Sequence, residues 1–291
     1  MAEQPLQSAR VDGRLSLSFE RRDGTDRTVV MVREQQSPLR VVRAFPVAGG
    51  AALVHLHNLS GGVLGGDRLE IVVEAGPRAH AQLTSTGATR LYRSRAGLPP
   101  AIQCTTVSVG ANALLEYLPD PLIPFAGSRY RQETRIALAA GAGLFWWEIL
   151  APGRAARDEL FAYDRLDMRL DIVAEGRLVA LERMQLEPRL RPLSSPARLG
   201  PYHYFATFYI CRVGMDASDW LALEAQLAEL AQQRTRPDEE LWGVSTLPAH
   251  GLIVRALSCS GRAIAPGLLA FWQAAKLALY GQPAVPPRKL Y

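Results

Sequence analysis

Lysine and cysteine are scarce in this chain of 291 residues. Of its 33 basic residues only Lys276 and Lys289 are lysines, and the rest are arginines, which favour fixed, bidentate contacts with carboxylate or phosphate. The basic residues are scattered and form no polybasic run, so the net charge of +5 does not indicate a nucleic-acid partner. The three cysteines are widely spaced and odd in number, which argues against a disulfide framework and indicates a reducing compartment.

Long uninterrupted apolar segments are also missing. The N-terminal segment is polar and lacks the apolar core of a signal peptide. The most apolar run, residues 138–150, contains Glu148 and is too short to span a bilayer. A second run, residues 263–281, is long enough but is interrupted by Gln273 and Lys276. We therefore expect a cytoplasmic protein with no membrane partner.

No helical pattern of useful length occurs before about residue 200. Residues 14–20 alternate apolar and polar side chains, with the period of a half-buried strand. The lack of helices argues against βαβ units and a doubly wound parallel sheet, and it leaves a large sandwich, a barrel or an irregular solenoid. Further strands are expected at residues 27–33, 51–58, 67–74, 79–85, 101–109, 112–118, 130–138, 143–150, 160–173, 177–184 and 202–213.

Two helices are expected near the C-terminus, at residues 216–233 and 266–280, with two more strands within residues 241–257. The apolar faces of the helices either cover the β-rich body or receive a partner. The prediction is a mainly β protein with two C-terminal helices. It forms a single domain, residues 1–291, with a β-rich part at 14–213, a mixed part at 214–281 and an extended, proline-rich tail at 282–291.

Residues 60–67 (SGGVLGGD) form the most unusual stretch of the sequence. Its four glycines, Gly61, Gly62, Gly65 and Gly66, allow backbone geometry that residues with a Cβ avoid. The stretch does not match a phosphate-binding loop, because it lacks the Gly-Lys-Ser/Thr ending and precedes a strand rather than a helix. We interpret it as a pair of tight structural turns.

Three carboxylates, Asp67, Glu148 and Glu182, share strand faces with apolar side chains. Burying an ionised carboxylate without a partner is costly, so each is expected to pair, to titrate or to meet a cation. Pairing with an arginine is the plain interpretation, whereas convergence of the three would favour an internal polar path or a metal-handling site. The residues in line with them are Leu69, Ile71 and Val73 for Asp67, Leu144, Trp146 and Leu150 for Glu148, and Leu178, Ala180 and Met184 for Glu182.

Other catalytic patterns are weak or missing. His55 and His57 lie on one strand face as half of a transition-metal site, but residues 59–66 contain no acidic ligand, which favours a structural role. The sequence has no Gly-x-Ser-x-Gly motif and no Cys–His signature, which argues against acyl-transfer chemistry. A glycoside hydrolase built on two of the carboxylates stays open as the alternative, because such a pair is defined by its distance in the fold.

Four blocks follow one another in the first half of the chain: residues 60–69 (SGGVLGGDRL), 83–94 (LTSTGATRLYRS), 115–125 (LEYLPDPLIPF) and 153–161 (GRAARDELF). Together they resemble the urease accessory protein UreD family, also called UreH. The final residues, 287–291 (PRKLY), are more loosely similar. Two positions depart from the family pattern: Arg90 stands where the family usually has Lys, and Asp158 where it usually has Gly.

The resemblance implies a large, irregular, β-helix-like body with two helices and a role that is not enzymatic. Proteins of this family act as scaffolds for nickel insertion into apo-urease, and their partners are UreF, UreG and the urease apoprotein. No tightly bound cofactor is implied, only transient Ni²⁺ on an internal path. Asp67, Glu148 and Glu182 match acidic positions of that path, and Ser85 and Thr89 match residues that line it.

Overall fold

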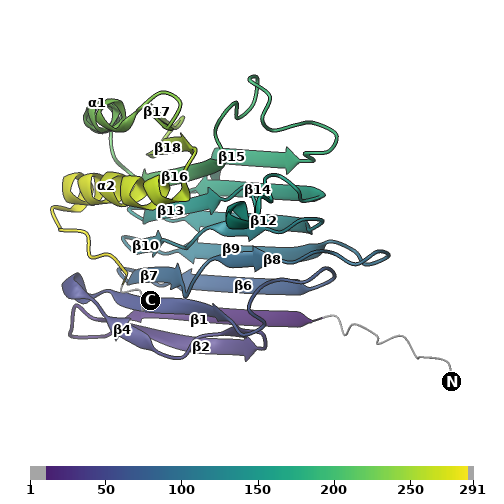
Figure 1. Cartoon of the computed structure of the whole chain (residues 1–291). Helices are drawn as coiled ribbons and strands as arrows, with labels where there is room; N and C mark the ends of the chain where they lie inside the picture. Colours follow the sequence, from purple (N-terminus) through teal and green to yellow (C-terminus); the bar gives the residue numbers. More distant parts are fainter. Residues whose placement is uncertain (1–10, 288–291) are drawn as a thin grey trace.

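Between residues 52 and 174 the chain passes alternately through two stacked sheets in the computed structural model, which describes residues 11–287 (Figure 1). From β5 (Ala52–Asn58) to β14 (Arg165–Ala174), the chain returns to the same sheet after one coil and pairs there in parallel with the preceding coil. A parallel pair needs a long crossover connection, and here a strand of the opposite sheet supplies it. A chain without early helices can therefore still form parallel sheets, as a β-helix.

The first layer is a seven-stranded sheet. Its central strands are parallel, and antiparallel strands close it at both ends, where β2 pairs with β1 and β15 pairs with β14. The spatial order is β15 (Arg177–Leu186), β14, β12 (Arg129–Leu138), β9 (Ala101–Val109), β6 (Arg68–Ala75), β1 (Asp12–Arg21) and β2 (Thr28–Gln36).

The second layer is an eleven-stranded sheet that continues past the end of the first. Its main path is β17 (Glu240–Thr246), β18 (Gly251–Ser258), β16 (Tyr204–Arg212), β13 (Gly143–Leu150), β10 (Leu114–Tyr117), β7 (His80–Ser85), β5 and β3 (Leu39–Arg40). The short strands β4 (Ala44–Pro46), β8 (Thr89–Leu91) and β11 (Leu122–Pro124) pair beside this path, and η1 (Ala48–Gly50) and η2 (Ala155–Arg157) are single 3₁₀ turns.

Two hydrophobic cores share the eleven-stranded sheet. The first core fills the space between the sheets, and the second lies between the eleven-stranded sheet and two helices. Successive side chains of a strand point to opposite faces, so β13 contributes Leu144 and Trp146 to the first core and Phe145 and Trp147 to the second. The mainly β fold class with two C-terminal helices is confirmed.

The helices α1 (Ala217–Arg234) and α2 (Gly261–Tyr280) bury their apolar faces against the eleven-stranded sheet. Of the two interpretations of these apolar faces, cover for the β-rich body or a surface for a partner, the structure shows the first. The expected start of α2 at Pro266 is wrong, because Ser260 caps the helix earlier by accepting a hydrogen bond from the backbone N–H of Arg262. By length and composition alone α2 is apolar enough to cross a membrane, but in this fold it is a core helix beside the sheet.

Two expectations about strands are corrected. Residues 160–164 do not belong to β14, because the chain turns at Phe161, whose φ is 53°, and the strand begins at Arg165. Leu178 does not share the inward face of Glu182. A register shift between Ile172 and Val173 inserts an extra residue into β15, so Leu178 is 56% exposed.

The tail after α2 is expected to be extended. Residues 282–287 contain no helix or strand, and the last part of the predicted tail, with the PRKLY similarity, lies largely outside the described residues.

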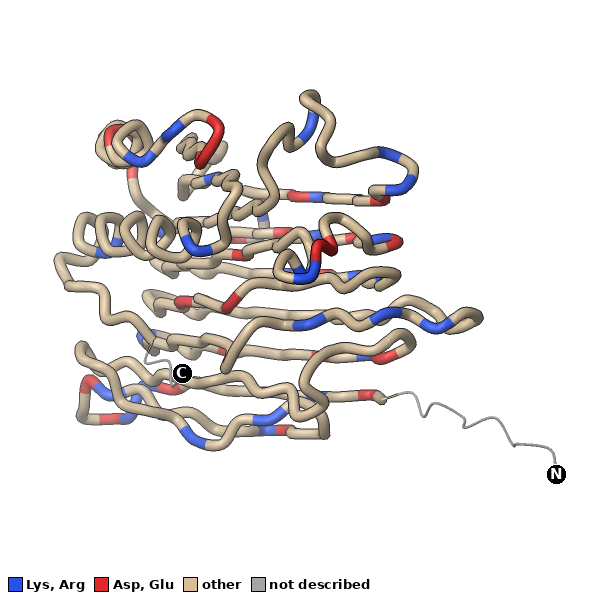
Figure 2. The backbone as a smooth tube through the Cα atoms, in the orientation of Figure 1, with Lys and Arg blue, Asp and Glu red and all other residues tan. Residues whose placement is uncertain are grey.

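The outward face of the seven-stranded sheet carries ion pairs along single strands. Arg169 pairs with Asp171, and Arg131 with Glu133, two residues apart on the same face. Figure 2 shows blue and red positions interspersed along the strands. Many arginines are therefore neutralised locally by a neighbouring carboxylate.

Candidate functional site

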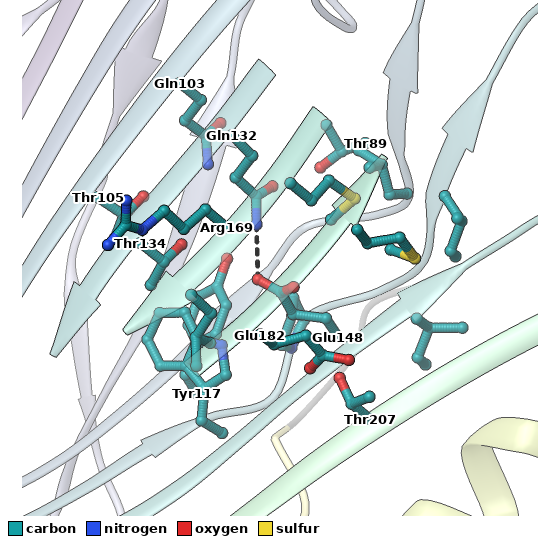
Figure 3. Close-up of a pocket in the computed structure, with 18 of the residues that line it drawn as sticks. Thr89, Gln103, Thr105, Tyr117, Gln132, Thr134, Glu148, Arg169, Glu182 and Thr207 are labelled. Carbon is teal, nitrogen blue, oxygen red and sulfur yellow. Dashed lines mark hydrogen bonds between the residues drawn. The ribbon is translucent and has the colours of Figure 1, made fainter. Parts of the chain in front are cut away.

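A cavity of about 70 Å³ lies between the two sheets, near the end closed by β15 and β16. Glu148 of β13, Glu182 of β15 and Gln132 of β12 meet in it (Figure 3). The cavity thus brings polar side chains together in the space between the sheets. Other inward polar residues that line it are Thr89, Gln103, Thr105, Tyr117, Asp120, Tyr130, Thr134 and Thr207. Arg169 also borders it, but its side chain is outward and pairs with Asp171.

The pairing of the strands explains why polar side chains gather there. The parallel register of β9 and β12 sets Gln103 beside Gln132 and Thr105 beside Thr134. In the facing sheet, Glu148 stands beside Thr207 of β16. Because side chains on one face repeat every second residue, an unshifted register aligns these inward polar positions into a polar wall.

Glu148 has no arginine partner within residues 11–287. Its Oε1 accepts a hydrogen bond of 2.6 Å from Nε2 of Gln132 (Figure 3). Burial, and to a lesser extent the charge of Glu182, raise the pKa of Glu148 from 4.5 to about 7. Hydrogen bonding from Gln132 and from the indole of Trp146, two residues earlier on the same face, lowers the pKa in part, but burial outweighs it. Among the described residues, Glu148 therefore has neutral donors and no cationic partner.

Glu182 is better compensated. Its Oε2 accepts a hydrogen bond of 2.6 Å from the hydroxyl of Tyr209, and its Oε1 lies 3.4 Å from Nη2 of Arg255. Its side chain is 18% exposed, so solvent reaches the cavity beside this carboxylate. Two identical acids thus face one cavity, one enclosed with an amide partner and one paired with a cation at the edge.

Asp67 faces the interior, as the alternation predicts, and is only 2% exposed. Its Oδ2 accepts a hydrogen bond of 2.9 Å from the backbone N–H of Leu64, which closes the turn before β6. Asp67 does not line the cavity of Glu148 and Glu182. The structure therefore brings two of the three predicted carboxylates together and places the third at a turn.

The glycines at residues 61–66 lie in the turns and bends that lead from β5 to β6. At Gly62 a Cβ would stand 2.5 Å from the carbonyl oxygen of Arg90, and Gly66 has a φ of 93°. Both positions therefore require glycine, the first for a close approach of two backbones and the second for its left-handed conformation. Gly61 and Gly65 belong to the same two turns.

Thr89 and Ser85 occupy different places. Thr89 lines the cavity from β8, whereas Ser85 does not. Instead, the Ser85 hydroxyl accepts a hydrogen bond of 2.8 Å from the backbone N–H of Asp120, a residue of the cavity wall. Ser85 thus contacts the cavity wall from outside.

His55 and His57 line a separate hollow on the outer face of β5, together with Phe45 and Ser85. The rings of His55 and Phe45 meet edge to face with centroids 5.5 Å apart. Burial and the neighbouring His55 lower the pKa of His57. Within the described part of the chain no group of three or more His, Cys, Asp or Glu residues could hold a metal ion, so the His pair lacks a third ligand of these types.

A further buried acid, Glu116 of β10, escaped the sequence analysis. It is fully buried in the second core, where its Oε1 lies 2.6 Å from Nζ of Lys276 on α2. Gln82 donates a hydrogen bond of 2.9 Å to its Oε2, and Nε2 of His80 lies 3.4 Å from the same oxygen. Glu116 lies two residues from both Leu114 and Leu118 and so shares their strand face. The parity argument applied to Asp67 therefore also predicts that Glu116 is buried.

Comparison with known proteins identifies the family of the chain. The family model described as UreD urease accessory protein matches residues 11–290. The urease accessory protein UreD of Herpetosiphon aurantiacus is 49% identical over 282 residues, 97% of each chain. The urease accessory proteins UreD of Pseudomonas aeruginosa and Nitrosococcus oceani are 35% and 38% identical over 90% of this chain and 89% and 84% of their own.

These names describe accessory proteins and not enzymes, which decides against the glycoside hydrolase alternative. The family match also extends beyond the blocks of residues 60–161 to nearly the whole sequence. This chain belongs to the UreD family of urease accessory proteins.

Proposed function

We propose that this protein is a scaffold and metallochaperone that helps to insert nickel into apo-urease, in a cytoplasmic complex with UreF and UreG. The observation that carries the proposal is the convergence of Glu148 and Glu182 in one internal cavity. The cavity is proposed as a segment of a path for Ni²⁺, with Thr89 in its wall. The sequence also predicts Asp67 for this path, but Asp67 does not line the cavity, so a role in the turn that it closes is tested against a role in the path below.

The ligands suit a metal that must be released. The residues that line the cavity include no histidine and no cysteine. Carboxylates, amide oxygens and water hold Ni²⁺ more weakly than several imidazoles or thiolates do. The volume of about 70 Å³ has room for a few water molecules, so the ion would keep part of its hydration. We therefore propose transient binding of Ni²⁺ and no resident cofactor.

The protonation of Glu148 supports this role. With a pKa of about 7, Glu148 carries its proton in part of the molecules at neutral pH, which avoids an unpaired charge in the cavity. A divalent cation that binds both carboxylates favours the ionised form of Glu148. Ni²⁺ binding is therefore expected to release a proton and to strengthen as the pH rises through 7.

The path is tested in cells that co-express the urease subunits, UreF and UreG under limiting nickel. Glu148→Gln and Glu182→Gln should lower the nickel content and activity of urease several-fold, while the tagged protein still recovers the same partners. Glu187→Gln is the matched control, because Glu187 pairs with Arg165 on the surface, 3.3 Å away, and does not line the cavity. Full nickel content with both cavity variants would contradict the path.

The scaffold role is tested by leaving the chain out of the same cells. UreF and apo-urease should co-purify with the tagged protein, and urease should gain nickel and activity only when the chain is present. If no partner is recovered and urease is equally active without the chain, the scaffold proposal is wrong.

A further inference from the structure

The mouth of the cavity lies where the seven-stranded sheet ends. β15 is the last strand of that sheet, whereas the eleven-stranded sheet continues beyond β16 to β18 and β17. Glu182 projects from β15 and is the partly exposed acid of the pair. A cation that enters from solvent at this end therefore meets Glu182 before Glu148.

Arg255 spans this mouth from the opposite sheet. It stands on β18 beside Thr207 of β16, which itself stands beside Glu148 of β13. Its guanidinium reaches across to Glu182, with 3.4 Å between Nη2 and Oε1. The side chain of Arg255 is not itself part of the cavity wall, but it bridges β18 and β15 on the exposed side of Glu182.

The surroundings of Arg255 let it leave this position. Its side chain is 57% exposed, and exposed ion pairs are weak. The residue opposite it on β17 is Gly243, where an added Cβ would meet nothing within 4 Å, so open solvent lies on that side. The other partner of Glu182, Tyr209, is 2% exposed and hydrogen-bonded at 2.6 Å. Glu182 thus has one fixed partner and one movable partner.

We propose that Arg255 is the gate of the Glu148–Glu182 cavity, an assignment that rests on the nickel path proposed above and adds its control. In the paired position the guanidinium of Arg255 is bound to Oε1 of Glu182, and its positive charge repels an incoming divalent cation. When Arg255 turns into solvent, Oε1 of Glu182 is free to bind the cation and the repulsion falls. Arg255 is a positioning residue, since it acts on the cation through Glu182.

The test measures Ni²⁺ binding to the purified full chain by titration calorimetry at pH 7.5. Arg255→Gln should lower the Kd for Ni²⁺ roughly threefold to tenfold, because it removes one like charge from the mouth. Arg255→Lys keeps the charge and should stay within about twofold of the wild type. The gain in Arg255→Gln should shrink in high salt, where exposed charges are screened.

Arg177→Gln is the matched control for charge. Arg177 is exposed at the start of β15, the strand that carries Glu182. The rise per residue of a strand places the two residues roughly 16 Å apart. Arg177→Gln should leave the Kd unchanged. If Arg255→Gln binds Ni²⁺ no more tightly than Arg177→Gln does, or if Arg255→Lys gains as much as Arg255→Gln, the gate is overturned.

Glu182→Gln separates failure of the gate from failure of the path. If Glu182→Gln weakens Ni²⁺ binding while Arg255→Gln leaves it unchanged, the gate alone is overturned. If Glu182→Gln also binds as the wild type does, the cavity does not hold the metal and both proposals fall. Circular dichroism should show the same fold for the arginine variants, because both arginines are exposed, and for Glu182→Gln, because the amide keeps an oxygen that accepts from Tyr209.

Discussion

Glu148 and Glu182 show how position decides the chemistry of one side-chain type. Glu148 is enclosed between the sheets with an amide partner at 2.6 Å, and its pKa rises to about 7. Glu182 stands at the edge and has Arg255 and Tyr209 as partners. In the proposed nickel path, Glu182 would supply a charge that attracts a cation, and Glu148 would add a second ligand when it loses its proton.

The stability of the protein should depend on pH through Glu148. Because burial and Glu182 raise its pKa from 4.5 to about 7, the folded state keeps a proton that the unfolded state loses between these pH values. The free energy of unfolding therefore falls as the pH rises through this window. Glu148→Gln removes the titration, so it should match the wild type below about pH 4.5 and exceed it at pH 8, by up to about 3 kcal/mol.

Urea denaturation at pH 4.5, 6 and 8 measures this difference. Glu187→Gln serves again as the control, since Glu187 forms an exposed ion pair and should show no comparable trend. A stability difference between Glu148→Gln and the wild type that does not grow with pH would show that Glu148 ionises normally.

Asp67 is expected to act through the turn that it closes. Asp67→Ala leaves the N–H of Leu64 without its acceptor and should cost about 1–3 kcal/mol of unfolding free energy. Asp67→Asn keeps an acceptor oxygen and should cost less than about 1 kcal/mol. Under limiting nickel, Asp67→Asn should support near-normal urease activation. Loss of nickel in Asp67→Asn despite normal stability would instead assign Asp67 a direct place in the path.

At the scale of elements, α2 is attached to the sheet by charge as well as by apolar packing. The side chain of Lys276 is 5% exposed and lies 2.6 Å from the fully buried Glu116. Burial opposes ionisation of Glu116, but His80 and Lys276 outweigh it and lower the pKa of Glu116. Gln82 joins this cluster to the tail, because its Nε2 also donates to the carbonyl oxygen of Val285. One acid therefore positions α2 and the tail on β7 and β10.

Lys276→Met should destabilise the protein by about 3–5 kcal/mol, because it leaves the Glu116 charge buried without its main cation. The double variant Glu116→Gln/Lys276→Met removes both charges and should recover most of this loss. Urea denaturation of the two single variants and the double variant gives the coupling energy. Additive losses would mean that the pair does not interact energetically.

At the scale of the whole molecule, the eleven-stranded sheet couples the two cores. β13 and β16 present one face to each core, with Trp146 in the first and Trp147 in the second. If the packing on one face of a strand is lost, the packing on its other face is disturbed too, since both faces depend on the same backbone hydrogen bonds. The helical layer and the β-helix are therefore expected to unfold together.

Tryptophan fluorescence provides the measurement. The tryptophans are Trp146 in the first core and Trp147, Trp220, Trp242 and Trp272 in the second. In Trp146→Phe the fluorescence reports the helical layer, whereas amide hydrogen exchange of β6, β9 and β12, followed by mass spectrometry in urea, reports the seven-stranded sheet. The two signals should give one urea midpoint. Separate midpoints would show that the helical layer unfolds independently.

Much of the local structure follows from sequence because its causes are local. The direction of a strand side chain depends on parity, and parity alone places Asp67 on a buried face. The helix at Ala217–Arg234 follows from leucines at helical spacing. The predicted inward orientation of Leu178 is wrong because β15 has an extra residue there. This extra residue depends on the pairing of β15 with β14 and has no signal in the local sequence.

The strand-rich class, the two helices, the turn glycines and, through the ordered blocks, the likeness to one family all follow from the sequence. Which buried groups meet depends on the fold. Glu148 and Glu182 share a cavity because the coils stack in a particular register. Glu116 meets Trp272, 156 residues away, because α2 returns across the sheet. Parity shows that a side chain faces inward, but its neighbour depends on pairings between distant segments, which a local pattern does not contain.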